Sequence, residues 1–275
     1  MLKGKIILLT GATDGIGYQT AIELAKLNPV LILHGKNLKK GETIKKELIS
    51  WSGNKQIHYF NADLSSFSQI EAFSEAIHKE FQHIDILINN AGIYESNKII
   101  LDNGFEKTFM VNHLAAFSLS LSFLDLLKKA NNAKIINVSS MVHAGSIDFG
   151  NLNAEKSYSG DSAYSLSKLC NILFSYELAE RLKSQNILVN AMHPGVINTK
   201  LLRAGWGPFG SSVTEGAKRI LFLAKDEEEN FTNKYFENDR VVKSAQISYD
   251  EATRRQLWKI SISWANQFLK KKLSL

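Results

Sequence analysis

Short apolar runs alternate along the chain with longer stretches in which apolar residues recur at helical spacing. The first run, Lys5–Leu9, precedes a helical pattern that Asn28-Pro29 ends. Each run is nearly all apolar, as expected for strands of a parallel sheet that is buried on both faces. In chain order the next expected elements are strand Val30–Leu33, helix 39–50, strand Gln56–Phe60, helix 67–81, strand Ile84–Ile88, helix 104–128, strand Lys134–Val138, helix 161–183 and strand Ile187–Ala191.

Six strand–helix units in strict alternation predict an α/β fold of the Rossmann type, a doubly wound parallel sheet of about seven strands with helices on both faces. The tail adds a helix over Val213–Ala224, a short last strand at Lys234–Phe236 and an amphipathic stripe at 257–268. We predict a single domain over 1–275, with a C-terminal helix at about 250–270. That helix either covers the substrate side or a sheet edge, or packs in the core, and the pattern leaves both open.

Composition narrows the class of protein. The chain has 275 residues, of which 44% are hydrophobic and 22% charged, values typical of a globular domain. The opening apolar run, Ile6–Leu9, is far too short for a signal peptide or a membrane span. No later segment reaches the roughly 18 apolar residues that a span needs. We therefore expect a soluble protein without an integral membrane segment.

Cysteine content and charge add further limits. Cys170 is the only cysteine, which rules out a disulfide framework and fits a reducing, cytoplasmic location. The formal charge of +6 is typical of solvated lysine faces, although a phosphate-bearing ligand would also explain it. Charge is the sole feature that favours nucleic acid, so we expect no nucleic-acid partner. We expect Lys270–Lys272 to lie in a frayed, solvated tail, and we predict no metal site.

A glycine-rich turn, TGATDGIG at Thr10–Gly17, joins the first strand to the first helix. In a dinucleotide-binding fold this turn wraps around the pyrophosphate, and the helix N-terminus offers free amides. Gly11 permits the tight turn, and Gly15 and Gly17 let the backbone approach the phosphates. Asp14 is expected to cap the helix and to point away from the phosphates. A glycine turn without a ligand is the plain alternative.

The end of the second strand, LILHGKN, bears on the type of dinucleotide. A carboxylate there would bind the ribose 2′-hydroxyl and repel a 2′-phosphate, but Gly35 occupies the approximate position. Lys36 follows, and a cation that faces a dianionic 2′-phosphate favours NADP(H). His34 could assist. A lysine-rich helix start that faces water is the alternative.

The stretch AYSLSK places Tyr164 and Lys168 on one helix face, because residues four apart are neighbours there. Hydride transfer between a nicotinamide and a carbonyl needs a proton donor beside the carbonyl oxygen. A lysine ammonium near a tyrosine is expected to lower the pKa of the phenol. Ser139 or Ser140, at the end of the fifth strand, could hold the substrate oxygen. The spacing alone also fits an ordinary helix turn, so the other motifs must decide.

Several motifs in the expected order resemble the short-chain dehydrogenase/reductase family. They are the glycine spacing of TGATDGIG, NNAG at Asn89–Gly92, the YSLSK segment and HPGVINT at His193–Thr199. The finer pattern is closest to the retinol dehydrogenase-like branch, which includes WW-domain oxidoreductases, on account of AYSLSKLCNILFSYELAERL, NAMHPGVINTKL and KYF near residue 235. The resemblance covers about residues 4–240.

The resemblance implies a role for each matching residue. Tyr164 would donate the proton, and Lys168 would tune Tyr164 and bind the nicotinamide ribose. Ser140 would hold the oxygen, with Ser139 as the second choice. Asn112 would support a water that relays protons, or else be a buried amide that bends its helix. The full set of residues expected to bind the cofactor is Thr10, Gly11, Asp14, Gly15, Ile16, Gly17, Lys36, Asp63, Leu64, Asn90, Ala91, Gly92, Tyr164, Lys168, Pro194, Gly195, Val196 and Thr199.

Two residues near these motifs need separate comment. Asp63 resembles the family aspartate that meets the adenine, but it also suits a turn or cap. His193 is expected to pack in its turn without a catalytic role.

The motifs together predict an NADP(H)-dependent oxidoreductase of the alcohol dehydrogenase or carbonyl reductase type, with pro-S hydride transfer implied by the resemblance. A substrate lid is expected at about 197–215, where Leu201, Leu202, Trp206 and Phe209 favour an apolar substrate, bulky or long-chain. A non-catalytic NADP(H)-binding sensor is the alternative class. Family members often form homodimers through the helices that carry Asn112 and Tyr164, and this branch also includes monomers.

Overall fold

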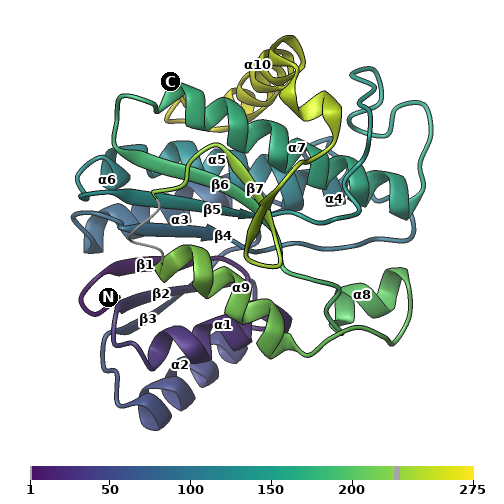
Figure 1. Ribbon diagram of the computed structural model, residues 1–275. Helices are drawn as coiled ribbons and strands as arrows, with labels where there is room; N and C mark the ends of the chain where they lie inside the picture. Colours follow the sequence, from purple (N-terminus) through teal and green to yellow (C-terminus); the bar gives the residue numbers. More distant parts are fainter. Residues whose placement is uncertain (1, 226–229) are drawn as a thin grey trace.

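A single eight-stranded sheet forms the centre of the molecule within residues 2–225 and 230–275, the part of the chain that this computed structural model describes (Figure 1). The predicted domain, 1–275, thus includes five residues, 1 and 226–229, that lie outside the described residues. The strand order is β3-β2-β1-β4-β5-β6-β7-β8, and every neighbouring pair is parallel except β7 and β8. The strands are β1 Ile6–Leu9, β2 Val30–Gly35, β3 Ile57–Asn61, β4 Ile86–Asn89, β5 Ala133–Val138, β6 Ile187–His193, β7 Lys234–Glu237 and β8 Arg240–Val242.

The doubly wound α/β fold expected from the sequence is confirmed, with one strand more than the seven we predicted. The additional strand, β8, is three residues long and mostly exposed, so it carries no apolar run. It pairs with β7 through a tight turn at Asn238-Asp239, where both residues adopt positive φ. Such a turn favours a two-residue hairpin.

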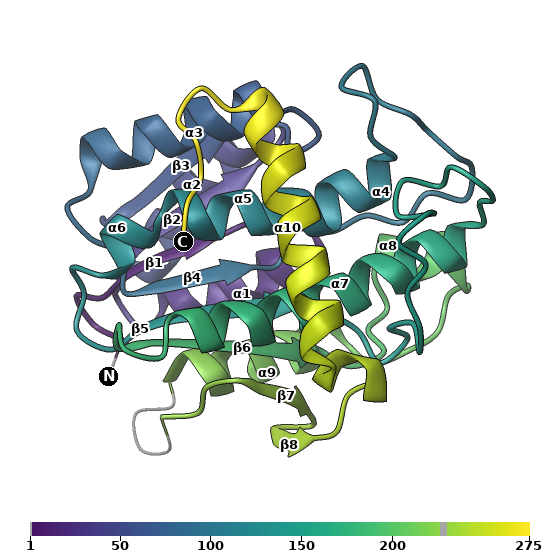
Figure 2. The ribbon, with the colours of Figure 1, turned by 90° about the horizontal axis from the view of Figure 1, so that it is seen from above.

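Helices cover both faces of the sheet (Figures 1 and 2). One face carries α1, α2 and α9, and the other carries α3, α5, α7 and α10. Because side chains alternate along a strand, Leu8 packs in the core on the α3 side, whereas Ile7 and Leu9 pack in the core on the α1 side. The helices are α1 Gly15–Ala25, α2 Leu38–Ser52, α3 Phe67–Glu80, α4 Lys107–Phe109, α5 Ala115–Ser122, α6 Leu124–Leu127, α7 Gly160–Arg181, α8 Lys200–Gly205, α9 Val213–Lys225 and α10 Glu251–Phe268.

The long helix that we predicted over 104–128 is wrong in detail. The chain forms α4, then a π-helical turn at Met110–Leu114, then α5 and α6. The π-helical turn contains Asn112, and such turns within α-helices are frequent at functional sites. Apolar spacing alone cannot distinguish a π-helical turn from a regular one.

The last helix, α10, lies across α7 and α5 (Figure 2). Leu257, Trp258 and Ala265 are buried against that face, so of our two alternatives core packing is correct. The tail beyond α10 is held rather than frayed, because the backbone amides of Lys270 and Lys271 donate to Glu71 on α3. None of the helices in the described part of the chain combines the length and apolar character needed to cross a membrane.

The strand order reverses direction between β1 and β4, which lie side by side. The chain leaves β1 toward β2 and leaves β4 toward β5, so the carboxyl ends of these strands border a crevice. Ligands of doubly wound sheets bind in this crevice. The fold thereby brings the glycine turn and the NNAG segment to one edge of the sheet.

Candidate active site

Two adjoining cavities open at the carboxyl edge of the sheet. The larger, of about 430 Å³, is bordered by the glycine turn and by the ends of β2, β3 and β4. The smaller, of about 220 Å³, is bordered by the ends of β5 and β6, by α7 and by α8. We call them the dinucleotide groove and the catalytic pocket. The residues that line both are Ile16, Asn90, Gly92, Thr199 and Leu201.

The glycine turn forms the floor of the dinucleotide groove. A Cβ added at Gly17 would lie 2.1 Å from the Gly11 carbonyl oxygen, so only glycine lets α1 approach the turn this closely. Gly15 has a φ of 53°, a left-handed conformation that favours glycine. Thr10 is buried behind the turn and lines neither cavity, and its hydroxyl accepts from the amides of Asn90 and Ala91. A glycine floor at a helix N-terminus fits the pyrophosphate of a dinucleotide.

Asp14 caps α1, as predicted, and is among the residues that line the dinucleotide groove. Its carboxylate accepts from the Gly15 amide and pairs with Lys40 at 3.0 Å and with Lys200 at 2.8 Å. Partial burial would raise the pKa of Asp14, but the hydrogen bonds from Lys200, Lys40 and Gly15 lower it to about 2. Two lysines therefore more than balance this charge. Lys200, which belongs to α8, is a groove residue that the sequence reasoning missed.

The NNAG segment links the two cavities. Asn90 donates through its side-chain amide to the Thr10 carbonyl at 2.9 Å, and this bond ties β4 to β1. Asn89 donates to Asn137 and thereby holds the centre of the sheet. A Cβ added at Gly92 would lie 3.3 Å from Lys168 Nζ, so Gly92 leaves room for the ammonium.

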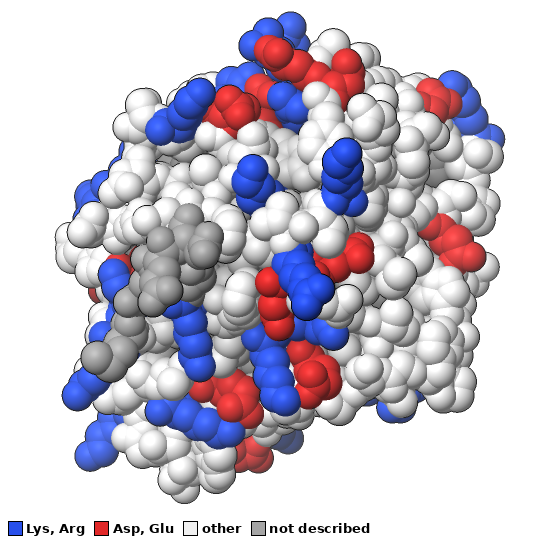
Figure 3. All heavy atoms as spheres, in the orientation of Figure 1, with Lys and Arg blue, Asp and Glu red and all other residues white. Residues whose placement is uncertain are grey.

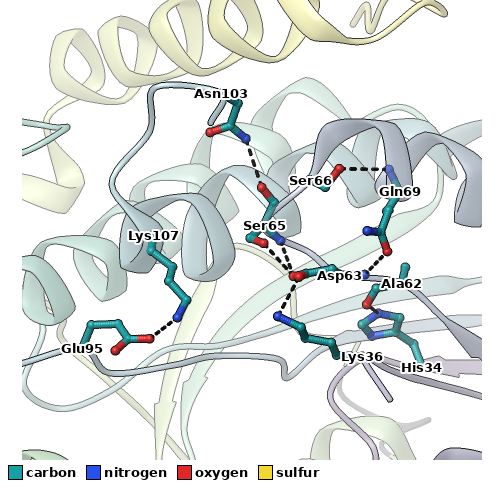
Figure 4. Close-up of polar contacts among 10 residues, drawn as sticks. All are labelled: His34, Lys36, Ala62, Asp63, Ser65, Ser66, Gln69, Glu95, Asn103 and Lys107. Atoms are coloured by element: carbon teal, nitrogen blue, oxygen red, sulfur yellow. Dashed lines mark hydrogen bonds and ion pairs between the residues drawn. The ribbon is translucent and has the colours of Figure 1, made fainter. Parts of the chain in front are cut away.

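The adenosine end of the groove carries an ion pair between Lys36 and Asp63 (Figure 4). The carboxylate of Asp63 also accepts from the amide and hydroxyl of Ser65, and Leu64 lines the groove beside it. Partial burial would raise the pKa of Asp63, but the bonds from Lys36 and Ser65 lower it. Asp63 is thus both a turn residue and a groove residue.

His34 does not supply positive charge to the groove, contrary to our expectation. Burial lowers the pKa of its imidazole to about 4, so the ring is neutral near pH 7. Both ring nitrogens are engaged, because Nε2 donates to the Ala62 carbonyl at 3.0 Å and Nδ1 accepts from the Gly11 amide at 3.4 Å. On the face shown in Figure 3, basic side chains are interspersed with acidic ones, which agrees with the ion pairing along the groove.

Tyr164 lies in the catalytic pocket beneath two aromatic side chains. Its ring centroid is 5.4 Å from that of Trp206, the residue that follows α8, and 6.0 Å from that of Tyr94. Burial raises the pKa of Tyr164 to about 12, and the nearby hydroxyl of Ser140 partly opposes that rise. This is the reverse of the lowering that we expected from Lys168. The aromatic cover removes water from the phenol and so disfavours its ionised form.

Lys168 is buried one helical turn from Tyr164. Its ammonium donates to the Val138 carbonyl at 3.1 Å and lies 5.4 Å from the centroid of the Tyr164 ring. Burial lowers the pKa of Lys168 to about 8. The ammonium therefore lies over the ring in the catalytic pocket, beside Gly92, a residue that also lines the groove.

The two candidate serines are placed differently. Ser139 donates its hydroxyl to the Lys168 carbonyl at 2.7 Å, so this group is committed to holding α7. The hydroxyl of Ser140 accepts from the Val142 amide, and Ser140 lines the catalytic pocket together with Tyr164, whose pKa it lowers. The geometry favours Ser140 as the group that would meet a substrate oxygen.

Asn112 lies behind the pocket and lines neither cavity. Its side-chain oxygen accepts from the Ile93 amide at 2.8 Å, and its nitrogen donates to the Ile93 carbonyl and to Ser167, each at 3.0 Å. The π-helical turn presents this amide to the segment after NNAG. Asn112 is thus a buried amide in an irregular helix, as one of our alternatives stated, and its role in a proton relay stays a prediction.

The turn after β6 and helix α8 form the outer wall of the catalytic pocket. Pro194, Gly195, Val196 and Thr199 line it, and Thr199 also caps α8. The wall is largely apolar, and the apolar side chains that α8 and the following turn contribute are Leu201, Leu202, Trp206 and Phe209. The predicted extent and motion of a lid here stay predictions.

Two further residues near the pocket were missed or undervalued. Tyr94 packs against both Trp206 and Tyr164 and donates its hydroxyl to Asp161 at 3.0 Å. It follows NNAG by two residues, so its position after β4 was the available signal. His193 lines the pocket as well, and burial, with smaller contributions from nearby cations, lowers the pKa of its imidazole to about 4.

Comparisons with known proteins agree on one family. A family profile for short chain dehydrogenases matches residues 5–206. Retinol dehydrogenase 13 of Mus musculus is 38% identical over 275 residues, which cover 94% of this chain and 82% of that protein. Retinol dehydrogenase 11 of Homo sapiens is 36% identical over 271 residues, which cover 94% of this chain and 85% of that protein.

Solved structures share the fold. An uncharacterised protein from Mycobacterium paratuberculosis superposes with a TM-score of 0.82 at 26% identity, covering 100% of this chain and 96% of that one. A short chain dehydrogenase from Escherichia coli, crystallised with NADPH, has a TM-score of 0.70 at 24% identity, covering 86% and 96%. The chain therefore belongs to the short-chain dehydrogenase/reductase family, in its retinol dehydrogenase-like branch, and is an oxidoreductase.

Proposed function

We propose that the protein is an NADP(H)-dependent oxidoreductase that transfers a hydride between nicotinamide and a carbonyl or alcohol of an apolar substrate. The observation that carries this proposal is the grouping of Tyr164, Ser140 and Lys168 in the catalytic pocket, which shares Gly92 with the dinucleotide groove. When bound, the nicotinamide supplies or accepts the hydride. The protein's own residues then have to move one proton and hold one oxygen.

Tyr164 supplies the proton in the reductive direction. A phenol with a pKa of about 12 is fully protonated near pH 7, so it can donate as negative charge develops on the carbonyl oxygen. Ser140 donates a second hydrogen bond to that oxygen. The same burial opposes the phenolate that this donation leaves behind, so a nearby positive charge is needed to stabilise it.

Lys168 stabilises the phenolate that remains after donation. A buried ammonium 5.4 Å from the ring acts in a medium where charges interact strongly. Its position beside Gly92 also suits a bond to the nicotinamide ribose. Asn112 holds Ile93 and Ser167 in place. In our proposal it also supports a water that relays protons between Lys168 and the solvent.

The choice of NADP(H) rests on Lys36. It follows Gly35, where no carboxylate is present, and its ammonium lies at the adenosine end of the groove. The crystallised Escherichia coli relative with NADPH supports this preference by analogy. The proposed cofactor contacts are those of the glycine turn, NNAG and the turn after β6.

The substrate class follows from the lining of the catalytic pocket. Its outer wall is apolar, and Met141, Val142 and Phe209 remain about half exposed at its mouth. A cavity of about 220 Å³ takes the reacting end of a molecule, and a longer apolar chain would continue past these three residues. The relatives named retinol dehydrogenases support an apolar alcohol or aldehyde.

Partners and location remain proposals. We propose a small-molecule substrate, no nucleic-acid partner and a cytoplasmic location. A homodimer through the helices of Asn112 and Tyr164 would have to involve α10, since α10 packs on α5 and α7. A non-catalytic NADP(H) sensor is the competing function, and it leaves the grouping of Tyr164, Ser140 and Lys168 unexplained.

The test is a panel of aliphatic, aromatic and isoprenoid aldehydes and ketones with NADPH, read by loss of absorbance of the reduced nicotinamide. We expect oxidation of NADPH with at least one apolar carbonyl. Tight NADPH binding with no turnover across the panel would support the sensor instead.

A further inference from the structure

The adenosine end of the groove contains a carboxylate that the second strand itself lacks. A Cβ at Gly35 would lie 2.6 Å from Thr13 Cγ2, so a side chain at that position would have to displace Thr13. The neighbouring strand β3 pairs Asn61 with Gly35, and Asp63 follows two residues later. Asp63 therefore supplies a carboxylate beside the end of β2, within 2.7 Å of Lys36 Nζ.

The carboxylate of Asp63 is held by hydrogen bonds from Ser65, whereas the side chain of Lys36 is largely exposed. One oxygen of Asp63 accepts from the Ser65 amide at 3.0 Å and from the Ser65 hydroxyl at 2.7 Å. The other oxygen lies 2.7 Å from Lys36 Nζ. The Asp63 side chain is 23% exposed, whereas that of Lys36 is 70% exposed. Figure 4 shows Lys36 directed at Asp63. It also shows Asn103, which donates a hydrogen bond to the Ser65 carbonyl on the side away from Lys36.

This pairing changes the electrostatics that a 2′-phosphate would meet. The phosphate would gain the attraction of Lys36 but would have to compete with Asp63 for the ammonium. It would also lie near the negative charge of Asp63, which repels a phosphate but does not repel a neutral ribose 2′-hydroxyl. Exposed ion pairs are weak, so Lys36 can exchange one anion for another at modest cost.

We propose that Asp63 is a specificity-determining residue that limits the preference for NADP(H) over NAD(H) by acting as the counter-ion of Lys36. This inference rests on the proposed function, because it concerns how the same groove chooses between two dinucleotides. Asp63 lowers the advantage of the 2′-phosphate, so the protein retains useful affinity for NADH. Removal of its charge leaves Lys36 free and sharpens the preference.

The test measures binding rather than turnover. The full chain and its Asp63→Asn variant are titrated with NADPH and NADH by fluorescence of the reduced nicotinamide at low ionic strength. Calorimetric titrations with 2′,5′-ADP and 5′-AMP repeat the comparison for the adenosine end alone. Any change in the adenine contact is common to both ligands, so the ratio of the two dissociation constants isolates the 2′-phosphate.

Asp148 offers a matched control. Its carboxylate accepts from the amide two residues later, Gly150, and pairs with Lys156 at 2.8 Å, which repeats the arrangement of Asp63. It lies in the linker before α7 and lines neither cavity. Asp148→Asn therefore makes the same change in net charge and breaks a similar ion pair away from the groove.

We expect Asp63→Asn to raise the NADH-to-NADPH ratio of dissociation constants by about three- to ten-fold, or about 0.7–1.4 kcal/mol. Asp148→Asn should leave the ratio within about two-fold. Lys36→Gln should lower the ratio, and adding Asp63→Asn to it should restore part of the loss. Added salt should reduce each difference.

Two results would overturn the inference. An unchanged or lowered ratio in Asp63→Asn would show that Asp63 serves the adenine or holds Lys36 in place. A double variant no better than Lys36→Gln would show that the carboxylate does not oppose the phosphate. Failure of the wild type to bind either dinucleotide would instead remove the proposed function, so the two failures are distinguishable.

Discussion

The dinucleotide groove and the catalytic pocket adjoin each other, but their lysines have different surroundings. Along the groove, Lys36, Lys107 and Lys200 each have a carboxylate within hydrogen-bonding distance. In the pocket, the ammonium of Lys168 donates to the backbone carbonyl of Val138, and burial lowers its pKa to about 8. The lysines of the groove can exchange their carboxylate partner for another anion. The ammonium of Lys168 in the pocket is instead disfavoured by burial.

This difference separates binding from chemistry. Exposed, paired lysines cost little to maintain and can tune affinity for a phosphate. A buried, unpaired ammonium next to a protonated phenol is costly to maintain and is useful when charge appears nearby. Substitutions in the groove should therefore change mainly the affinity for the dinucleotide, whereas substitutions in the pocket should change mainly turnover.

The largest effect is expected for Tyr164→Phe. It removes the proton donor but keeps the ring that packs on Trp206 and Tyr94. Turnover should fall by about 10³- to 10⁴-fold, while NADPH affinity changes by less than about three-fold. Steady-state rates and a fluorescence titration measure the two quantities. Retained turnover would remove Tyr164 from its proposed role.

Lys168→Met should lower activity and raise stability. The folded pKa of about 8 lies below the ordinary lysine value of 10.5, so burial of the charge costs stability below pH 8, and this cost fades as the pH rises toward 10.5. We expect turnover to fall by about 10²- to 10³-fold. The free energy of unfolding at pH 7 should rise by about 1–2 kcal/mol, after allowance for the lost bond to Val138.

Denaturant unfolding at pH 7 and near pH 10 measures this stability effect, with the exposed Lys129→Met as control. The gain should largely disappear at the higher pH, and the wild-type rate of reduction should decline above about pH 8 as Lys168 loses its proton. A loss of stability at pH 7 would contradict the account of Lys168 as a buried, uncompensated charge.

Lys36→Glu tests the groove. It places a second carboxylate beside Asp63, so NADPH affinity should fall by about ten- to a hundred-fold and NADH affinity far less. Lys156→Glu, which reverses a remote paired lysine, is the control. If both dinucleotides weaken equally, Lys36 does not read the 2′-phosphate.

Trp206→Ala should produce the smallest effect. It removes part of the cover over Tyr164, so the pKa of the phenol should fall from about 12 toward its usual value near 10. A spectrophotometric titration, compared with that of Tyr164→Phe, measures this shift. The value of kcat/KM for apolar carbonyls should fall about three- to ten-fold. Trp51→Ala, on the exposed side of α2, should change neither.

The sequence predicted the features that depend on local pattern. Apolar runs indicated the parallel strands, and the glycine turn, NNAG and AYSLSK fell at the carboxyl edge because chain order fixes which strand each motif follows. Features that depend on contacts between distant segments were missed. The bond from Lys200 to Asp14 joins residues 186 apart, and the cover of Tyr164 by Trp206 depends on the path of α8. Burial, and with it the raised pKa of Tyr164, could not be read from spacing.

The most direct measurement uses NADPH deuterated at the pro-S position of the nicotinamide. A carbonyl from the panel is reduced in a single turnover, and the alcohol is examined by mass spectrometry. The account predicts one deuterium at the carbinol carbon with the wild type and negligible product with Tyr164→Phe. Alcohol without the label, or NADPH bound with no alcohol formed from any carbonyl, would contradict it.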